Sequence, residues 1–292
     1  MTSAQSSFSE TDRQVDFARI ADIARAEAGL QIPQEKASMV FSRLAKRARK
    51  LGLPDIASYL AVLDGPNGKD ERRGLIEALT TNVTSFFREP HHFDHLAEKI
   101  LPSLMDAARK GERVRIWSAG CSTGAEPYTI AMCVLEACPE AAQLDIRILA
   151  TDIDRDVLAT AEKGVYAATL LKKVPPEIRA KYFSERSRDG DTLRACENLR
   201  ALCTFRPLNL MTQWPMRGAF DIIFCRNVVI YFDAETQAAL WPRFEALLKS
   251  GGHLFVGHSE RVEGVPATEL VPVGTTTYRK GGAQYSGSRE RY

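Results

Sequence analysis

The sequence predicts an α/β protein in which an all-helical N-terminal module precedes a doubly wound sheet that carries a small antiparallel β insertion. Three observations support this prediction. Residues 12–63 show helical periodicity without strand-like alternation, which is typical of a helical module. Residues 113–128 combine a short apolar strand, a loop of small residues and the start of a helix, which together make half of a nucleotide-binding α/β unit. Further apolar strands at 145–150, 220–225 and 253–257 are each followed by polar residues, at the edge where open α/β sheets bind ligands.

Composition limits the class of protein. The chain has 292 residues, of which 45% are hydrophobic and 26% charged, as in a globular protein with one large domain and a smaller companion. No apolar run approaches the roughly 18–20 residues that span a bilayer, so we expect no membrane insertion. The net charge of +2 is too small to predict nucleic-acid binding. The six cysteines show no Cys-x-x-Cys spacing, which favours reduced thiols in the cytoplasm.

Turn-rich and polar stretches predict the domain limits. Residues 1–10 are Ser-rich without an apolar core, which indicates a disordered lead rather than a secretory signal. The Asp64–Asp70 stretch contains two glycines and a proline, so we place the end of the helical domain, residues 11–70, there. The sheet domain then covers residues 71–280, and 281–292 form a flexible tail.

The helical module contains a basic helix face. Between Lys36 and Asp55 there is no acidic residue, and one face of the predicted helix carries Arg43, Lys46, Arg47 and Lys50. A solvated outer face is the usual explanation of such a run. The alternative is a docking surface for an acidic partner.

The loop Gly120–Gly124 follows the strand that contains Val114 and Trp117. Glycines let a ligand approach the backbone closely. Glu126 would repel a phosphate, and neither phosphate-binding glycine pattern is present, so a cationic ligand such as a sulfonium or an ammonium fits better. An ordinary strand-to-helix turn explains the loop alone equally well.

A second polar stretch, Thr81–Pro90, mixes hydroxyl, amide, aromatic and Arg side chains and is a candidate lining for a small-molecule site. The alternative is a helix cap followed by a hydrophobic anchor. His91 and His95 have i,i+4 spacing, but no further ligand cluster accompanies them, so we predict no metal site.

Polar residues at strand ends complete the candidate site. Asp152 ends the second strand, where an acidic residue commonly binds ribose hydroxyls. Asp154 is expected to cap the helix Arg155–Lys163. Arg226 and Asn227 follow the third strand.

The α/β rhythm is interrupted at about residues 182–205. Asp189-Gly190 is a hairpin signal, and we expect Thr192–Cys196 and Leu202–Phe205 to be the flanking strands of a small antiparallel insertion.

With these stretches in hand, the chain resembles the CheR-type chemotaxis receptor methyltransferases over about residues 12–280. The resemblance lies in five blocks in the family's order, which are Thr81-Asn-Val-Thr-Ser-Phe-Phe-Arg-Glu89, Ala119-Gly-Cys-Ser-Thr-Gly124, Glu126-Pro-Tyr128, Ala150-Thr-Asp-Ile-Asp154 and Cys225-Arg-Asn-Val-Val-Ile-Tyr-Phe-Asp233. It implies a seven-stranded methyltransferase sheet, S-adenosylmethionine as cofactor with S-adenosylhomocysteine as product, and receptor glutamates as methyl acceptors.

The resemblance also implies site residues. Cofactor contacts would fall on Asn82, Thr84, Arg88, Gly120, Glu126, Asp152, Asn209, Leu210, Arg226 and Asn227. Arg88 and Tyr231 would serve the reaction by steering or aligning the substrate carboxylate. The acidic helices of the receptor would meet Arg43, Lys46, Arg47 and Lys50.

Two departures from the family pattern have consequences. Ala125 stands where many members carry a second acid, so the cofactor's charge environment depends more on Glu126. Members that dock on a receptor's C-terminal pentapeptide carry extra glycines near the hairpin, whereas only Asp189-Gly190 is present here, which argues against pentapeptide tethering. A methyltransferase acting on RNA or a small molecule, and a scaffold that binds the cofactor product without turnover, are the rival interpretations.

Overall fold

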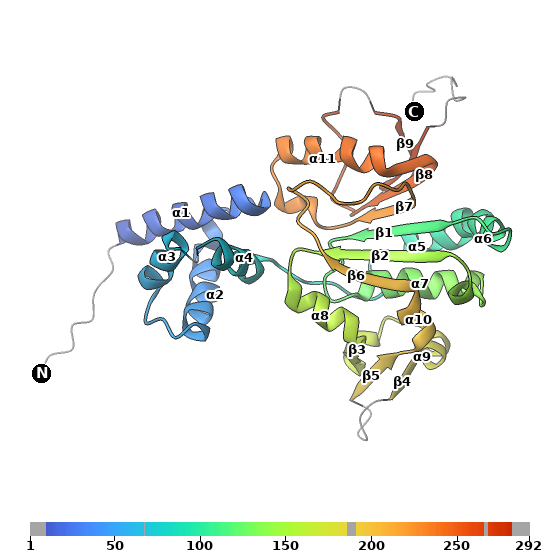
Figure 1. The fold of residues 1–292 in the computed structure, drawn as a ribbon, viewed down its shortest axis with the longest axis horizontal. Helices are drawn as coiled ribbons and strands as arrows, with labels where there is room; N and C mark the ends of the chain where they lie inside the picture. The colour runs from blue at the N-terminus through green and yellow to red at the C-terminus, as the bar shows by residue number, and fades with distance from the viewer. Residues whose placement is uncertain (1–9, 67, 186–190, 266–267, 282–292) are drawn as a thin grey trace, which may run out of the picture. The chain divides into compact units, whose positions relative to one another are not determined.

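The computed structural model describes residues 10–66, 68–185, 191–265 and 268–281. By its internal contacts the chain divides into two units. The first comprises Met1–Thr81 with Tyr231–Asp233, and the second comprises Asn82–Ile230 with Ala234–Tyr292. The predicted order of a helical module and an α/β domain is confirmed (Figure 1).

The first unit is helical. Its helices are α1 (Glu10–Ala28), α2 (Ala37–Lys50), α3 (Ile56–Asp64) and α4 (Gly68–Leu79). Asp55 caps α3 by accepting a hydrogen bond from the backbone of Ser58 at 2.8 Å. Helix α4 packs against α1, α2 and α3, so the first unit ends at Thr81 and not at residue 70 as the Asp64–Asp70 turn suggested. That turn joins two helices of one unit.

The basic face of α2 is only partly free. Arg43 is half-buried and donates to the carbonyl oxygens of Leu79 and Thr80 at 2.8 and 2.7 Å, where it satisfies the C-terminal end of α4. Arg47 is also half-buried and forms an ion pair with Glu71. These two predicted docking residues therefore stabilise the helical unit, because the acceptors they bind come from α4. Lys46 and Lys50 are exposed.

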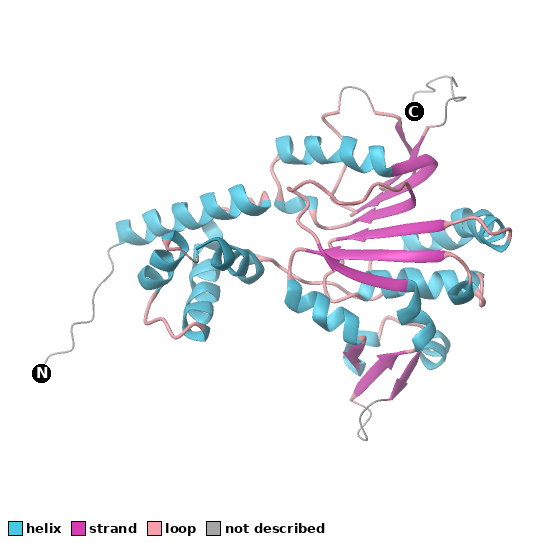
Figure 2. Ribbon diagram, viewed as in Figure 1, coloured by secondary structure: helices cyan, strands magenta, loops and turns pink. Residues whose placement is uncertain are grey.

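The second unit contains a seven-stranded sheet with the order β6-β2-β1-β7-β8-β10-β9 (Figures 1 and 2). Its strands are β1 (Val114–Ala119), β2 (Ile146–Asp152), β6 (Cys203–Pro207), β7 (Phe220–Cys225), β8 (Leu248–Val256), β9 (Leu270–Gly274) and β10 (Thr277–Lys280). The first five pair in parallel and β10 is antiparallel to both of its neighbours. The predicted doubly wound, seven-stranded sheet is confirmed.

The helices of this unit are α5 (Pro90–His95), continued by a π-helical turn (Leu96–Ile100) into α6 (Leu101–Arg109), then α7 (Ala125–Ala137), α8 (Arg155–Lys163), α9 (Pro176–Tyr182), α10 (Glu197–Leu202) and α11 (Ala234–Leu247). Helices α7 and α8 pack on β2 and β6, and α11 packs on β8. Asp154 caps α8 as predicted, since its carboxylate accepts from the backbone N–H groups of Asp156 and Val157.

The inserted β unit differs from the prediction. It is a three-stranded antiparallel sheet in the order β3 (Val165–Ala167), β5 (Thr192–Ala195), β4 (Phe183–Glu185). The segment expected as its second flanking strand, Leu202–Phe205, instead supplies most of β6, the edge strand of the main sheet, which pairs in parallel with β2. The turn signal Asp189-Gly190 lies outside the described residues.

All six cysteines are free. Across the described residues, none of the helices has both the length and the apolar character that crossing a membrane requires.

Candidate functional site

The small-residue loop after β1 lies against the end of β2. The backbone N–H groups of Gly120 and Cys121 both donate to the carbonyl oxygen of Thr151, at 2.8 and 2.9 Å. Gly120 has φ +79°, and a Cβ there would lie 2.3 Å from Val228 Cγ2 in the loop after β7. A glycine is therefore required at this position both for its conformation and for the close approach of two loops.

Asp152 stands at the carboxyl end of β2 and is buried. Its Oδ2 accepts from the backbone N–H of Ser122 at 2.8 Å, and its Oδ1 accepts from that of Asp154 at 3.0 Å. Burial raises the pKa of the Asp152 carboxyl, against the effect of these hydrogen bonds. The carboxylate thus fixes the loop Gly120–Gly124 relative to β2, and its predicted contact with a ribose stays a prediction.

Asn82 joins the loop before α5 to the same two strand ends. Its Nδ2 donates to Asp154 Oδ2 at 2.6 Å, and its carbonyl oxygen accepts from Ser122 Oγ at 2.9 Å. Arg88, later in this loop, is half-buried, and its Nη1 donates to the carbonyl oxygen of Val83 at 2.9 Å. Thr84 lies between them and is also half-buried. Of these three predicted residues, which share one loop, Asn82 contacts the segments that follow β1 and β2.

Arg226, at the end of β7, is the centre of a buried ion network. Its side chain is only 1% exposed, its Nη1 lies 3.1 Å from Glu126 Oε2, and its Nη2 lies 3.1 Å from Glu89 Oε2. It also donates to the carbonyl oxygen of Arg88. Glu126 accepts a further hydrogen bond, at 2.7 Å, from Ser118 Oγ. The network ties the end of β7 to the start of α7 and to the loop before α5.

The two acids of this network differ in their pKa. Burial raises the pKa of Glu126 above its ordinary value, although Arg226 and Ser118 oppose this effect. Burial acts in the same direction on Glu89, but Arg226 together with hydrogen bonds from His258 and Asn227 lowers its pKa to about 2. Glu89 is therefore firmly ionised, whereas the charge on Glu126 is less completely compensated.

Asn227 contacts the ion network of Arg226, and its predicted contact with the cofactor stays a prediction. It has φ +59°, a conformation in which Asn is enriched among residues other than glycine, and its Nδ2 donates to Glu89 Oε1 at 3.2 Å. Its backbone is held by Glu260, whose carboxylate accepts from the N–H groups of Asn227 and Val228, both at 2.9 Å. Glu260 is 2% exposed and follows β8.

Sequence reasoning gave no role to Glu89 or Glu260. The signal for Glu260 was its place after the fourth strand expected from the sequence, and that for Glu89 was its place at the end of a polar loop. Neither signal shows that Asn227 is the partner of both acids, because Asn227 lies 33 positions from Glu260 and 138 positions from Glu89.

Asn209 and Leu210 lie in the loop after β6. Asn209 Oδ1 accepts from the backbone N–H of Met211 at 2.9 Å, which shapes this loop. Leu210 is buried, and its carbonyl oxygen accepts from Arg243 Nη1 at 2.6 Å. The loop is thus formed and fixed at the edge of the sheet where the strands β1, β2, β6 and β7 end.

Tyr231 is grouped with the helical unit. It ends a short 3₁₀ helix (Val229–Tyr231), and its carbonyl oxygen accepts from the backbone N–H of Gln31 at 2.7 Å. The side chain is half-buried. Its expected part in the reaction stays a prediction.

Three histidines follow the stretch Thr81–Pro90. The i,i+4 pair His91 and His95 is not the pair that lies close to a further possible metal ligand. In the described part of the chain, the group close enough to share a cation is Glu89, His91 and His92, whose potential ligand atoms lie within 4.8 Å of one another. Glu89 is already paired with Arg226. Burial and the charge of Arg226 lower the pKa of His92 to about 3, which shows that the surroundings disfavour added positive charge there. We therefore assign no metal to this group.

The site as a whole carries an excess of negative charge. Glu89 and Glu126, nearly buried, pair with the guanidinium of Arg226, and Asp152 is buried at the end of β2. Burial raises the pKa of the Cys121 thiol, and both Asp152 and Glu126 raise it further, which places both carboxylates near the loop Gly120–Gly124. A cation bound at this loop would offset the cost of burying these carboxylates. The arrangement therefore suits a cationic ligand, as the sequence predicted.

Comparison with known proteins identifies the family. Residues 15–80 match the family model described as CheR methyltransferase, all-alpha domain, and residues 82–278 match CheR methyltransferase, SAM binding domain. The chain is 49% identical over 255 residues to a probable chemotaxis protein methyltransferase of Rhizobium etli, covering 87% of this chain and 95% of the relative. It is 41% identical over 246 residues to the chemotaxis protein methyltransferase of Escherichia coli, covering 84% and 83%. It is 40% identical over 266 residues to chemotaxis protein methyltransferase 2 of Pseudomonas aeruginosa, covering 90% and 92%. The chain belongs to the CheR methyltransferase family and is a methyltransferase that depends on S-adenosylmethionine.

Proposed function

We propose that this enzyme methylates glutamate side chains on the cytoplasmic helices of chemoreceptors and forms the methyl esters used in chemosensory adaptation. The names of the relatives, chemotaxis protein methyltransferases, support the substrate class. The observation that supports the cationic cofactor of this reaction is the excess of buried carboxylates, with Glu89 and Glu126 paired to Arg226 and Asp152 at the end of β2. The enzyme works in the cytoplasm, where its receptor helices and its reduced thiols belong.

The donor set fits S-adenosylmethionine, which carries a sulfonium and an ammonium group. Glu126 is assigned to the ammonium, because burial leaves its charge incompletely compensated. Asp152 is assigned to the ribose hydroxyls, with lone pairs beyond those used by Ser122 and Asp154. Asn209 and Asn227 are assigned to the adenine and methionyl portions, as the family resemblance implies.

The chemistry requires alignment and not a general base. When bound, the cofactor supplies an electrophilic methyl group, which a carboxylate oxygen accepts while the electron pair of the broken carbon–sulfur bond stays on sulfur. A receptor glutamate is already ionised at neutral pH, since its ordinary pKa is about 4.3. The residues of the enzyme therefore have to orient the carboxylate and exclude water. Arg88 steers the carboxylate by its charge, and Tyr231 aims one oxygen.

Receptor docking involves the exposed part of the basic face on α2. Lys46, Arg49 and Lys50 are exposed, whereas Arg43 and Arg47 are held by α4. Exposed cations attract an acidic receptor helix over about 8–10 Å at physiological ionic strength. Docking through a receptor pentapeptide is not part of the proposal.

The test is transfer of tritiated methyl groups from S-adenosylmethionine to receptor-containing membranes, followed by treatment of the labelled protein with base. We expect label that base releases as volatile methanol, because carboxylate methyl esters hydrolyse and N-methyl groups do not. Base-stable label would exclude a glutamate acceptor. Label in added RNA and none in receptor would favour the rival methyltransferase class.

A variant tests the assignment of Glu126 to the cofactor. Glu126→Gln should weaken binding of S-adenosylhomocysteine by about 1–3 kcal/mol, the usual cost of an unpaired buried polar group. Glu162, on α8, is exposed and provides the control Glu162→Gln, which should bind like the parent. Equal affinity of all three proteins would remove Glu126 from the cofactor site.

A further inference from the structure

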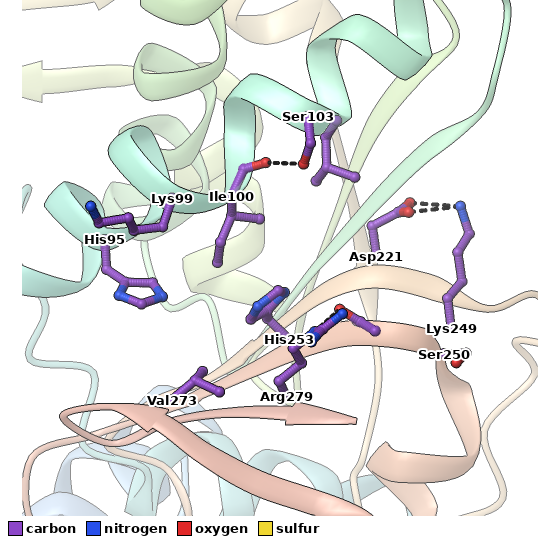
Figure 3. A pocket seen from close by; sticks show the side chains of 13 residues that line it. His95, Lys99, Ile100, Ser103, Asp221, Lys249, Ser250, His253, Val273 and Arg279 are labelled. Carbon is purple, nitrogen blue, oxygen red and sulfur yellow. Dashed lines mark hydrogen bonds and ion pairs between the residues drawn. The ribbon is translucent and has the colours of Figure 1, made fainter. Parts of the chain in front are cut away.

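A cavity of about 460 Å³ is drawn in Figure 3. It lies at the opposite end of β7 from Arg226. Its lining includes Asp221, near the start of β7, whereas Arg226 directly follows the end of that strand. Five residues of extended chain separate the two positions by about 17 Å. The cavity is therefore separate from the candidate cofactor site and unrelated to the residues assigned to it.

Three segments supply the histidines of the lining and its cations other than Lys249. His95 and Lys99 come from the helical segment before α6, His253 from β8 and Arg279 from β10. Figure 3 shows these side chains around the cavity, with the Asp221–Lys249 pair on its other side.

The acid in this lining is already neutralised. Lys249 Nζ lies 2.8 and 2.9 Å from the two carboxylate oxygens of Asp221, and Asp221 Oδ2 also accepts from the backbone N–H of Arg115. Lys99 and Arg279 are exposed, and neither has an ion-pair partner within the described ranges. The Nε of Arg279 makes a long hydrogen bond, 3.4 Å, to the carbonyl oxygen of Gly251. The lining thus includes two cations, Lys99 and Arg279, that are not held in an ion pair among the described residues.

Two neutral imidazoles add hydrogen-bond donors. Burial, Arg279 and His95 lower the pKa of His253 to about 4. Burial and Lys99 lower the pKa of His95, and Glu98 opposes them. Both rings are therefore neutral at pH 7 and each has an N–H group to donate. A bound anion would offset the neighbouring cations and raise both pKa values.

Part of the remaining lining is apolar, beside Ser103 and Ser250. Ile100 is buried, Leu104 is half-buried, and Val273 on β9 is 40% exposed. The volume lies within the range of about 300–1,000 Å³ found for small-molecule sites. An apolar wall beside uncompensated cations suits an anion with an apolar body, and not a bare inorganic ion.

We propose that this cavity is a second ligand site that binds a small organic phosphate, with the phosphate held by Lys99 and Arg279 and the organic part packed on Ile100, Leu104 and Val273. His95 and His253 donate to the remaining phosphate oxygens. The proposal does not depend on the identity of the methyl acceptor.

Calorimetry on the full-length protein tests the proposal. The protein is first saturated with S-adenosylhomocysteine, so that the cofactor site is filled, and guanosine monophosphate, inorganic phosphate and guanosine serve as the probes. We expect guanosine monophosphate to bind more tightly than the other two, and its affinity to fall with added salt. No binding of guanosine monophosphate at low salt, or equal binding of phosphate alone, would overturn the proposal.

Paired variants locate the binding. The double variant Lys99→Gln with Arg279→Gln should bind guanosine monophosphate at least about tenfold more weakly, because it removes two charge-assisted contacts. Lys163, exposed at the end of α8, provides the control Lys163→Gln, which should bind like the parent. An equal loss in the control would show non-specific attraction and would refute the assignment.

Histidine titration followed by NMR gives an independent readout. In the parent, guanosine monophosphate should raise the pKa of His253 above its value of about 4 in the free protein. A pKa of His253 that is the same with and without the probe would contradict the proposed position of the phosphate.

Discussion

Replacing Glu89 by Gln removes a buried charge, and the structure allows the cost to be worked out. The Glu89 side chain is 12% exposed, and its pKa is lowered from the ordinary 4.5 to about 2. Because the folded-state pKa is the lower one, the ionised carboxylate stabilises the fold at pH values above about 4.5, and this stabilisation is lost as the pH falls through about 2. The difference of about 2.5 between the two pKa values, at about 1.4 kcal/mol for each tenfold change, gives about 3 kcal/mol at pH 7.

Urea unfolding of the parent and Glu89→Gln measures this cost. At pH 7 we expect the free energy of unfolding of the variant to be lower by about 3 kcal/mol, and at pH 3.5 by about 2 kcal/mol. Glu98, exposed on the following π-helical turn, provides the control Glu98→Gln, which should differ from the parent by less than about 0.5 kcal/mol. A loss below about 1 kcal/mol at pH 7 that does not change with pH would refute the assignment of the network to Glu89.

Three further predictions concern binding and catalysis. Asp152→Ala should weaken binding of S-adenosylhomocysteine by about 1–3 kcal/mol in calorimetry, and unchanged affinity in the folded variant would remove Asp152 from the site. Lys46→Glu combined with Lys50→Glu should raise the KM for receptor, and this increase should be smaller in high salt. The affinity for cofactor should not change. Equal KM values of parent and variant at low salt would support the interpretation of this face as a solvated outer face. Tyr231→Phe should lower kcat by up to about a hundredfold without changing S-adenosylhomocysteine affinity. The pH–rate curves of parent and Phe variant should match between about pH 6.5 and 8.5, so a basic limb present only in the parent would argue against a carboxylate acceptor.

Elements with local signals could be predicted from the sequence. The bounds of α8 match the prediction because Asp154 caps its start and Gly164, with φ +61°, ends it. The bounds of β7 match because its six residues are all buried and, apart from Asp221, apolar. In such cases the information lies within the element and its neighbours.

Elements whose identity depends on a distant partner could not be predicted. The hairpin signal Asp189-Gly190 leads us to expect a strand at Leu202–Phe205, but it does not say whether this strand pairs within the insertion or, as observed, with β2 in the main sheet. In the same way, the basic pattern of α2 does not reveal that Arg43 and Arg47 bind α4.

The candidate site shows the same limit. Asp152, Glu126, Arg226 and Asn227 could be found because each follows a predicted strand, at the edge where ligands bind. The role of Glu89 could not, because its charge acquires a role only where Arg226, 137 positions later, is brought within 3.1 Å.

The assignment of residues 231–233 to the helical unit affects how relatives can be recombined. Asp233 forms an ion pair with Arg25 at 2.9 Å, and the carbonyl oxygen of Tyr231 accepts from the backbone of Gln31. A chimera that exchanges only residues 1–81 between two members of the family would therefore take Arg25 and Gln31 from one parent and their partners in 231–233 from the other. Matching chimeras have to take 231–233 from the same parent as 1–81, although about 150 residues of chain separate the two stretches.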